Sequence, residues 1–185
     1  MMKIFSPLLA LCIALSLSAC NQSSEPKPDV SVPNGKQAEV IDQLKTPELK
    51  LFKATADDAH DIQALEKYQI QFETISDAME NELLQLEKAG KLSPEFSHQR
   101  KRDNIESALT MLKALDLKTE QGRYIQGLMY RYWENQAKVV DEQKASETGE
   151  LDNPSDAIKG IGEFIHAEDQ LTHWKESTDH LPAEK

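Results

Sequence analysis

The chain has 185 residues and carries 21 lysines and arginines against 32 acidic residues, a net charge of −11. This balance argues against nucleic-acid binding, because phosphates require clustered Lys and Arg side chains. Both cysteines, Cys12 and Cys20, lie within the first twenty residues. The rest of the chain therefore has no disulfide, no thiol nucleophile and no cysteine ligand for zinc.

The first twenty residues are typical of a secretion signal. Lys3 provides a positive start, residues 4–16 are mainly apolar and uncharged, and the chain turns polar directly after Cys20. An apolar run this short cannot cross about 30 Å of hydrocarbon as a permanent helix. The segment is therefore expected to direct secretion and then to be removed.

The end of this segment, Leu17-Ser18-Ala19-Cys20, resembles the lipobox of bacterial lipoproteins. The resemblance implies cleavage before Cys20, a diacylglyceryl group on its thiol and a further acyl chain, such as palmitate, on its freed amine. More than one chain matters, because a single acyl chain binds a membrane only marginally. Asn21, where an Asp would resemble an inner-membrane retention signal, implies the outer membrane, facing the periplasm. The alternative is an ordinary secretion signal with a free Cys20.

Three regions follow from these observations. Residues 1–19 are the signal peptide, 20–37 a lipid-anchored, disordered linker, and 38–185 the folded domain. Cleavage removes one lysine and no acid, which leaves 20 basic residues against 32 acidic ones, or −12. The linker is rich in proline and, as a flexible coil, would reach on the order of 20–25 Å.

Helix signals dominate the folded domain. Residues 38–44 are expected to form a short helix, and Thr46-Pro47 predicts the start of another, with Thr as its cap. Apolar side chains then step by three and four through residues 56–89, which predicts one long helix face. These positions are Leu65, Tyr68, Phe72, Ile75, Met79, Leu83 and Leu86.

Gly90 predicts the end of this helix, and Ser93-Pro94 predicts the cap and first turn of the next. Further helices are expected over residues 94–115 and 119–144, and Ser155 is expected to cap the last one. The predicted fold is all-α: an up-and-down bundle of three to four main helices plus a short N-terminal helix, after the disordered tether.

Two patterns suggest metal binding. Glu163, His166, Asp169 and His173 are spaced so that neighbouring pairs share a face of the last helix, although the histidines are about 10 Å apart by helix rise. Glu-x-x-His also occurs twice, as Glu95/His98 and Glu163/His166, as in di-iron bundles. The alternative is a solvated helix whose histidines pair with nearby acids. The apolar stripe of the long helix contains no carboxylate, which disfavours a di-iron site.

No nucleophile elbow or phosphate-binding loop is present in the sequence, so we predict no catalytic residue and no cofactor. Tyr, Trp and Arg side chains gather on the helix at 119–144, and such residues are common in protein interfaces. The proposed partner-binding residues are Arg123, Tyr130, Arg131 and Trp133; packing against a neighbouring helix is the alternative.

The sequence thus predicts a lipid-anchored envelope protein that binds a protein partner and is not an enzyme, and one version is an immunity or inhibitor lipoprotein. The competing hypothesis is a metal-binding protein or metal-dependent enzyme.

Overall fold

The computed structural model describes residues 35–146, 151 and 153–179. The signal peptide, the lipobox with Cys20 and most of the linker lie outside these residues. The described residues form helices and no strand, in the order α1 (Gly35–Gln43), α2 (Asp58–Lys88), α3 (Pro94–Lys113), α4 (Glu120–Ala145), the 3-10 helix η1 (Pro154–Ile158) and α5 (Ile161–Asp179). None of the described helices is both long enough and apolar enough to cross a membrane.

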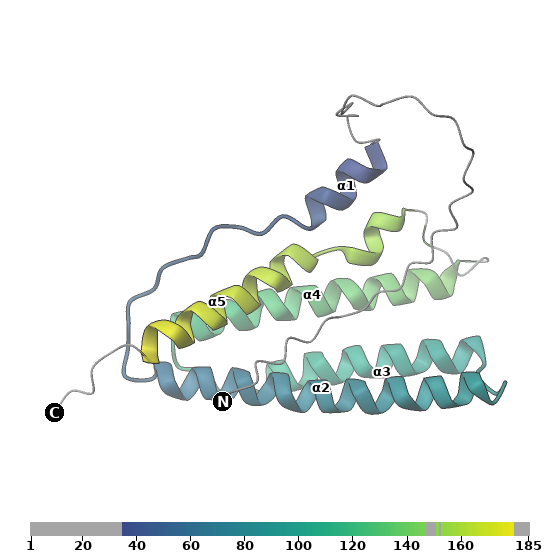
Figure 1. The fold of residues 1–185 in the computed structure, drawn as a ribbon, viewed down its shortest axis with the longest axis horizontal. Coiled ribbons are helices and arrows are strands. Elements are labelled where there is room, and N and C mark those ends of the chain that lie inside the picture. Colours follow the sequence, from purple (N-terminus) through teal and green to yellow (C-terminus); the bar gives the residue numbers. More distant parts are fainter. Residues whose placement is uncertain (1–34, 147–150, 152, 180–185) are drawn as a thin grey trace, which may run out of the picture. The chain divides into compact units, whose positions relative to one another are not determined.

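The four long helices pack against one another in sequence order, α2 on α3, α3 on α4 and α4 on α5 (Figure 1). Their shared core has Leu65, Leu112, Ile125 and Met129 at its centre, all without solvent exposure. The prediction of an all-α, up-and-down bundle is therefore confirmed.

Several helix ends also match the expectations. Ser93 caps α3 by accepting a hydrogen bond from the Phe96 amide at 3.1 Å. Gly90 follows α2 with a φ of 64°, a left-handed conformation that glycine adopts without strain. These two signals close α2 and open α3 where the sequence predicts.

The expected helix after Thr46-Pro47 is wrong. Residues 45–55, which we call the strap, contain neither helix nor turn and connect α1 to α2. A tertiary contact accounts for this. The Lys50 carbonyl accepts a hydrogen bond from the Gln170 side chain, and helical hydrogen bonding would compete for that carbonyl.

The start of the last helix also differs from the prediction. Asn153, rather than Ser155, is the cap, and it caps only the short η1 by accepting a bond from the Ser155 amide at 3.2 Å. Gly160 then takes a φ of 83°, and α5 begins at Ile161. A side chain at Gly160 would also come within 2.9 Å of the Asn135 amide, so the break is fixed by packing.

Candidate functional site

The aromatic residues of α4 pack inside the bundle. The Trp133 ring meets the Phe72 ring edge-on at 4.9 Å and the Tyr132 ring at 5.0 Å. Phe164 of α5 lies 4.6 Å from the Tyr132 ring, and Tyr130 packs half-buried against the core. Much of the aromatic surface of α4 therefore holds α2, α4 and α5 together.

The two arginines of the same helix also have internal partners. The Arg123 guanidinium donates to the carbonyls of Leu117 and Lys118, which secures the turn before α4. Arg131 is exposed and forms an ion pair with Glu163 of α5 at 3.2 Å. That Arg123, Tyr130, Arg131 and Trp133 bind a partner stays a prediction, but all four have a role in the fold.

The structure separates the metal-binding candidates of the last helix. Glu163 pairs with Arg131, whereas Asp169 and His173 are exposed. His166 is buried, with its Nε2 3.1 Å from the Tyr124 hydroxyl. Within the described residues, no three His, Cys, Asp or Glu side chains are close enough to share a metal ion.

The two Glu-x-x-His motifs lie at different ends of α4. His166 contacts Tyr124 in its first turns, whereas Glu95 and His98 line a hollow beside Gln143. Tyr124 and Gln143 are 19 positions apart in one helix, a rise of about 28 Å. The two motifs therefore do not converge on one metal site.

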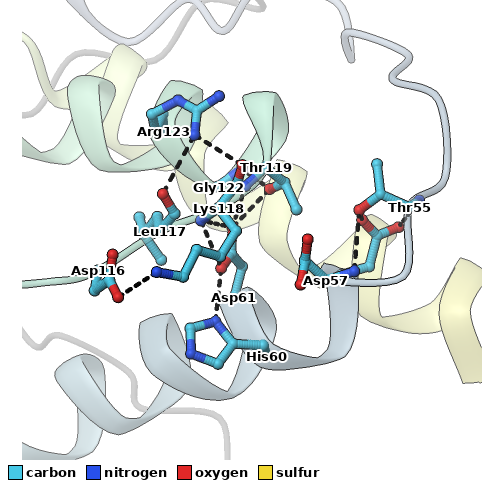
Figure 2. A network of polar contacts seen from close by, with 11 residues as sticks. Thr55, Asp57, His60, Asp61, Asp116, Leu117, Lys118, Thr119, Gly122 and Arg123 are labelled. Carbon is cyan, nitrogen blue, oxygen red and sulfur yellow. Dashed lines mark hydrogen bonds and ion pairs between the residues drawn. The ribbon is translucent and has the colours of Figure 1, made fainter.

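A network of polar contacts centres on Asp61, in the first turn of α2 (Figure 2). Its carboxylate has no solvent exposure and accepts hydrogen bonds from the Lys118 amide at 3.0 Å and the Thr119 amide at 2.7 Å. The Thr119 hydroxyl donates to the same carboxylate at 2.7 Å and accepts from the Gly122 amide, which caps α4. Asp61 thus joins the start of α2 to the start of α4.

The hydrogen bonds around Asp61 also set its charge state. Burial alone would raise the pKa of this carboxyl, but the donors from His60, Lys118 and Thr119 outweigh it and hold the pKa below the ordinary value. A Cβ at position 122 would lie 2.6 Å from the Asp61 Oδ2 atom, so Gly122 leaves the room that the carboxylate occupies. The site is filled by the chain itself, and it stabilises the fold rather than holding a ligand.

The sequence reading missed Asp61. An acid in the first turn of a helix is expected there to complement the helix dipole, and such acids are normally solvated. Its only local signal was position: Asp61 lies on the same α2 face as Leu65 and Tyr68, one turn earlier. The partner turn at residues 118–119 is 57 positions away in sequence, and periodicity does not report such pairings.

A half-buried carboxyl lies between α2 and α5. Glu168 accepts a hydrogen bond from the Gln69 side chain at 2.6 Å, beside a hollow of about 300 Å³. Burial raises the pKa of this carboxyl, and the nearby Asp169 acts in the same direction. The remaining charged residues of the hollow are Glu66, Lys175 and Glu176, and Lys175 pairs with Glu66. This group links the two helices.

The strap lies against α4 and α5. The Phe52 ring packs on the Tyr124 ring at 5.5 Å, and the Lys50 ammonium lies 4.9 Å from the same ring. Gly162 of α5 allows the chain to approach closely, because a Cβ there would come 2.3 Å from the Lys45 carbonyl oxygen. The strap is thus held by a few specific contacts and has no helical hydrogen bonds of its own.

The C-terminal end of α2, away from the strap, is packed less completely. The side-chain hydrogen bond and ion pair that link α2 to α5 come from Gln69 and Glu66, in the first half of α2. Figure 1 shows α2 and α3 continuing past the start of α5. We call this part, residues 75–104 and 140–146, the open end.

The apolar stripe of α2 is covered less completely at the open end. Leu65 and Tyr68 are buried, whereas Ile75 is 41% exposed and Met79, Leu83 and Leu86 are half-buried. Beside the stripe, Leu84 of α2 and Phe96 of α3 are exposed. A hollow between the start of α3 and the end of α4 is lined by Phe96, among others. The open end therefore combines apolar side chains with a concave surface, a pairing that is common in binding sites.

Arg100, Lys101 and Arg102 form the one dense basic run of the sequence, and their side chains make different contacts at the open end. Arg100 pairs with Glu82 of α2 at 2.8 Å, and Arg102 pairs with Asp141 of α4 at 3.2 Å. Lys101, between them, lines the hollow. The arginines therefore fasten α3 to both neighbours, and Lys101 contributes a positive charge to the open end.

Comparison with protein-family models, with curated proteins and with solved structures finds no match for this chain.

Proposed function

We propose that this chain is a lipid-anchored protein of the bacterial cell envelope whose helical domain binds a protein partner and does not act as an enzyme. Cys20 carries the lipid, and Asn21 favours the outer membrane, facing the periplasm. The proposal for the anchor is supported by the lipobox resemblance, and the proposal for binding is supported by the open end.

The observation that carries the binding proposal is the exposure of apolar side chains at the open end. Apolar positions at helical spacing are normally covered by neighbouring helices, yet Ile75 is exposed and Met79, Leu83 and Leu86 are only half-buried. Burying a side chain such as Leu or Phe is worth roughly 1.5–3 kcal/mol. A partner that covers Ile75 and Phe96 would therefore gain from residues that contribute little to this fold.

The internal contacts of α4 favour a binding surface away from Trp133. Its ring packs against Phe72 and Tyr132, whereas Phe96 and Lys101 lie at the hollow of the open end. Partner binding at the open end leaves the internal contacts of α4 intact.

A photo-cross-linking amino acid at position 96 or 84 tests the proposal in living cells. We expect a discrete adduct from either position, because both side chains are exposed at the open end. The matched control is position 70, an exposed apolar residue in the first half of α2, which should give no such adduct.

Equal adducts at all three positions, or none at 96 and 84, would contradict the binding proposal. An adduct with twice the mass of the chain would show that the open end pairs with a second copy, which would also contradict binding to a different protein.

A further inference from the structure

The strap contacts the bundle at a few positions and leaves two leucines in solvent. Lys50 and Phe52 lie against the Tyr124 ring, as an extended chain allows for residues two apart. Leu49 and Leu51, on either side of Lys50, are 43% and 82% exposed. These leucines therefore contribute little to packing within the bundle.

The end of α1 adds two more apolar side chains to this surface. Ile41 and Leu44 are three residues apart, on one face of the helix end, and both are about half exposed. Four of the nine large apolar side chains that are exposed in the described residues thus lie within the eleven residues 41–51. We call Ile41, Leu44, Leu49 and Leu51 the strap surface.

The charge of this segment differs from that of the rest of the chain. Residues 41–51 contain two lysines and two acids and are neutral, in a chain whose net charge is −11. A neutral apolar surface suits a bilayer with anionic headgroups better than the acidic remainder of the protein, which those headgroups would repel.

Among the exposed large apolar side chains of the described residues, those of the strap surface are nearest in sequence to Cys20. Twenty residues lie between Cys20 and Ile41, and because the last six of them belong to α1, they span less than about 70 Å. A lipid on Cys20 would hold the strap surface close to the bilayer, so even a weak contact would be favoured by its high effective concentration.

We propose that the strap surface contacts the bilayer, with Leu49 and Leu51 entering the headgroup region. This inference rests on the proposed lipid attachment at Cys20. Apolar side chains at this depth add to the affinity of an acyl anchor. Such a contact would fix which side of the domain faces the membrane.

The test uses the full chain, processed in cells, purified and reconstituted in vesicles of phosphatidylethanolamine and phosphatidylglycerol. With Cys20 consumed by lipid, a cysteine introduced by Leu51→Cys is the only free thiol and accepts one environment-sensitive fluorophore. Leu84→Cys, at the far end of α2, is the matched control.

We expect the fluorophore at position 51 to shift its emission to shorter wavelength in vesicles and to be quenched by brominated lipid, while the fluorophore at position 84 does neither. If the chain sediments with vesicles but position 51 behaves like position 84, the bilayer contact is wrong and the anchor stands. If the chain does not sediment with vesicles, both proposals fail. A blue shift at position 51 without vesicles would assign the leucines to protein contact and overturn the inference.

Discussion

The carboxylate of Asp61 is removed from water and compensated by donors from α2 and from the turn before α4. A buried charge of this kind is tolerated only when hydrogen bonds replace its hydration. Because the Thr119 hydroxyl both donates to Asp61 and caps α4, the carboxylate orders the helix start as well as the turn. Losing one residue would therefore disturb two elements.

Replacing this residue, Asp61→Asn, should lower the free energy of unfolding by about 1–3 kcal/mol, because an amide nitrogen would face the backbone donors and leave buried groups unpaired. Urea denaturation at neutral pH measures the change. Asp57→Asn, at an exposed position on the same helix start, should leave stability nearly unchanged. Equal effects of the two substitutions would contradict the role assigned to Asp61.

The pH dependence of stability provides a second test of the role of Asp61. The folded-state pKa of Asp61 is lowered from 3.8, so its contribution is fully present above that value and is lost as the pH falls through the lowered pKa. The difference in stability between the native chain and Asp61→Asn should therefore shrink as the pH drops below about 4. A difference that stays constant under acid would be inconsistent with a charged, hydrogen-bonded Asp61.

The backbone of the strap comes very close to the backbone of α5 at Gly162. A Cβ at Gly162 would lie 2.3 Å from the Lys45 carbonyl oxygen and 2.8 Å from that of Gln43. Gln170 donates to the Lys50 carbonyl a few residues further along the strap. The element thus depends on close approach at one glycine.

Gly162→Ala should displace the strap while α2 to α4 remain folded. We expect faster trypsin cleavage after Lys50 and Lys53, which limited proteolysis with mass spectrometry measures. Gly127→Ala is the control, because a Cβ there meets nothing closer than 3.9 Å and alanine favours a helix interior. If both variants are cleaved like the native chain, the strap does not depend on Gly162.

The long helices could be predicted from the sequence because their signals are local. The α2 stripe repeats at helical spacing, and Ser93 and Gly90 act within one turn of themselves. The strap could not be predicted, because Thr46-Pro47 has the pattern of a helix start, and residues distant in sequence, such as Tyr124, Gly162 and Gln170, hold the chain in another conformation.

The same difference between local signals and distant contacts applies to the candidate polar sites. Glu163 and His166 have a metal-like spacing in sequence, but the partners that decide their roles, Arg131 and Tyr124, lie on another helix. Trp133 was expected at a partner surface or in the packing, and only the positions of α2 and α5 show how far its ring is packed. Contacts between helices, and not the spacing within one helix, determine which residues are accessible to a metal ion or a partner.

For the molecule as a whole, the two proposed surfaces lie at different ends of α2. The strap leads into the start of this helix, whereas the open end lies at its finish, and 31 residues give a rise of about 45 Å. A bilayer contact at the strap would therefore leave the open end accessible to a partner. The two proposals are compatible in one orientation of the domain.

The proposed anchor and the bilayer contact both depend on the lipid at Cys20, and intact mass spectrometry of the chain isolated from membranes tests it most directly. We predict a mass that begins at Cys20 and includes a diacylglyceryl group, and a Cys20→Ser chain that retains residues 1–19. A membrane-isolated chain that starts at another residue, or that starts at Cys20 without lipid, would contradict the account.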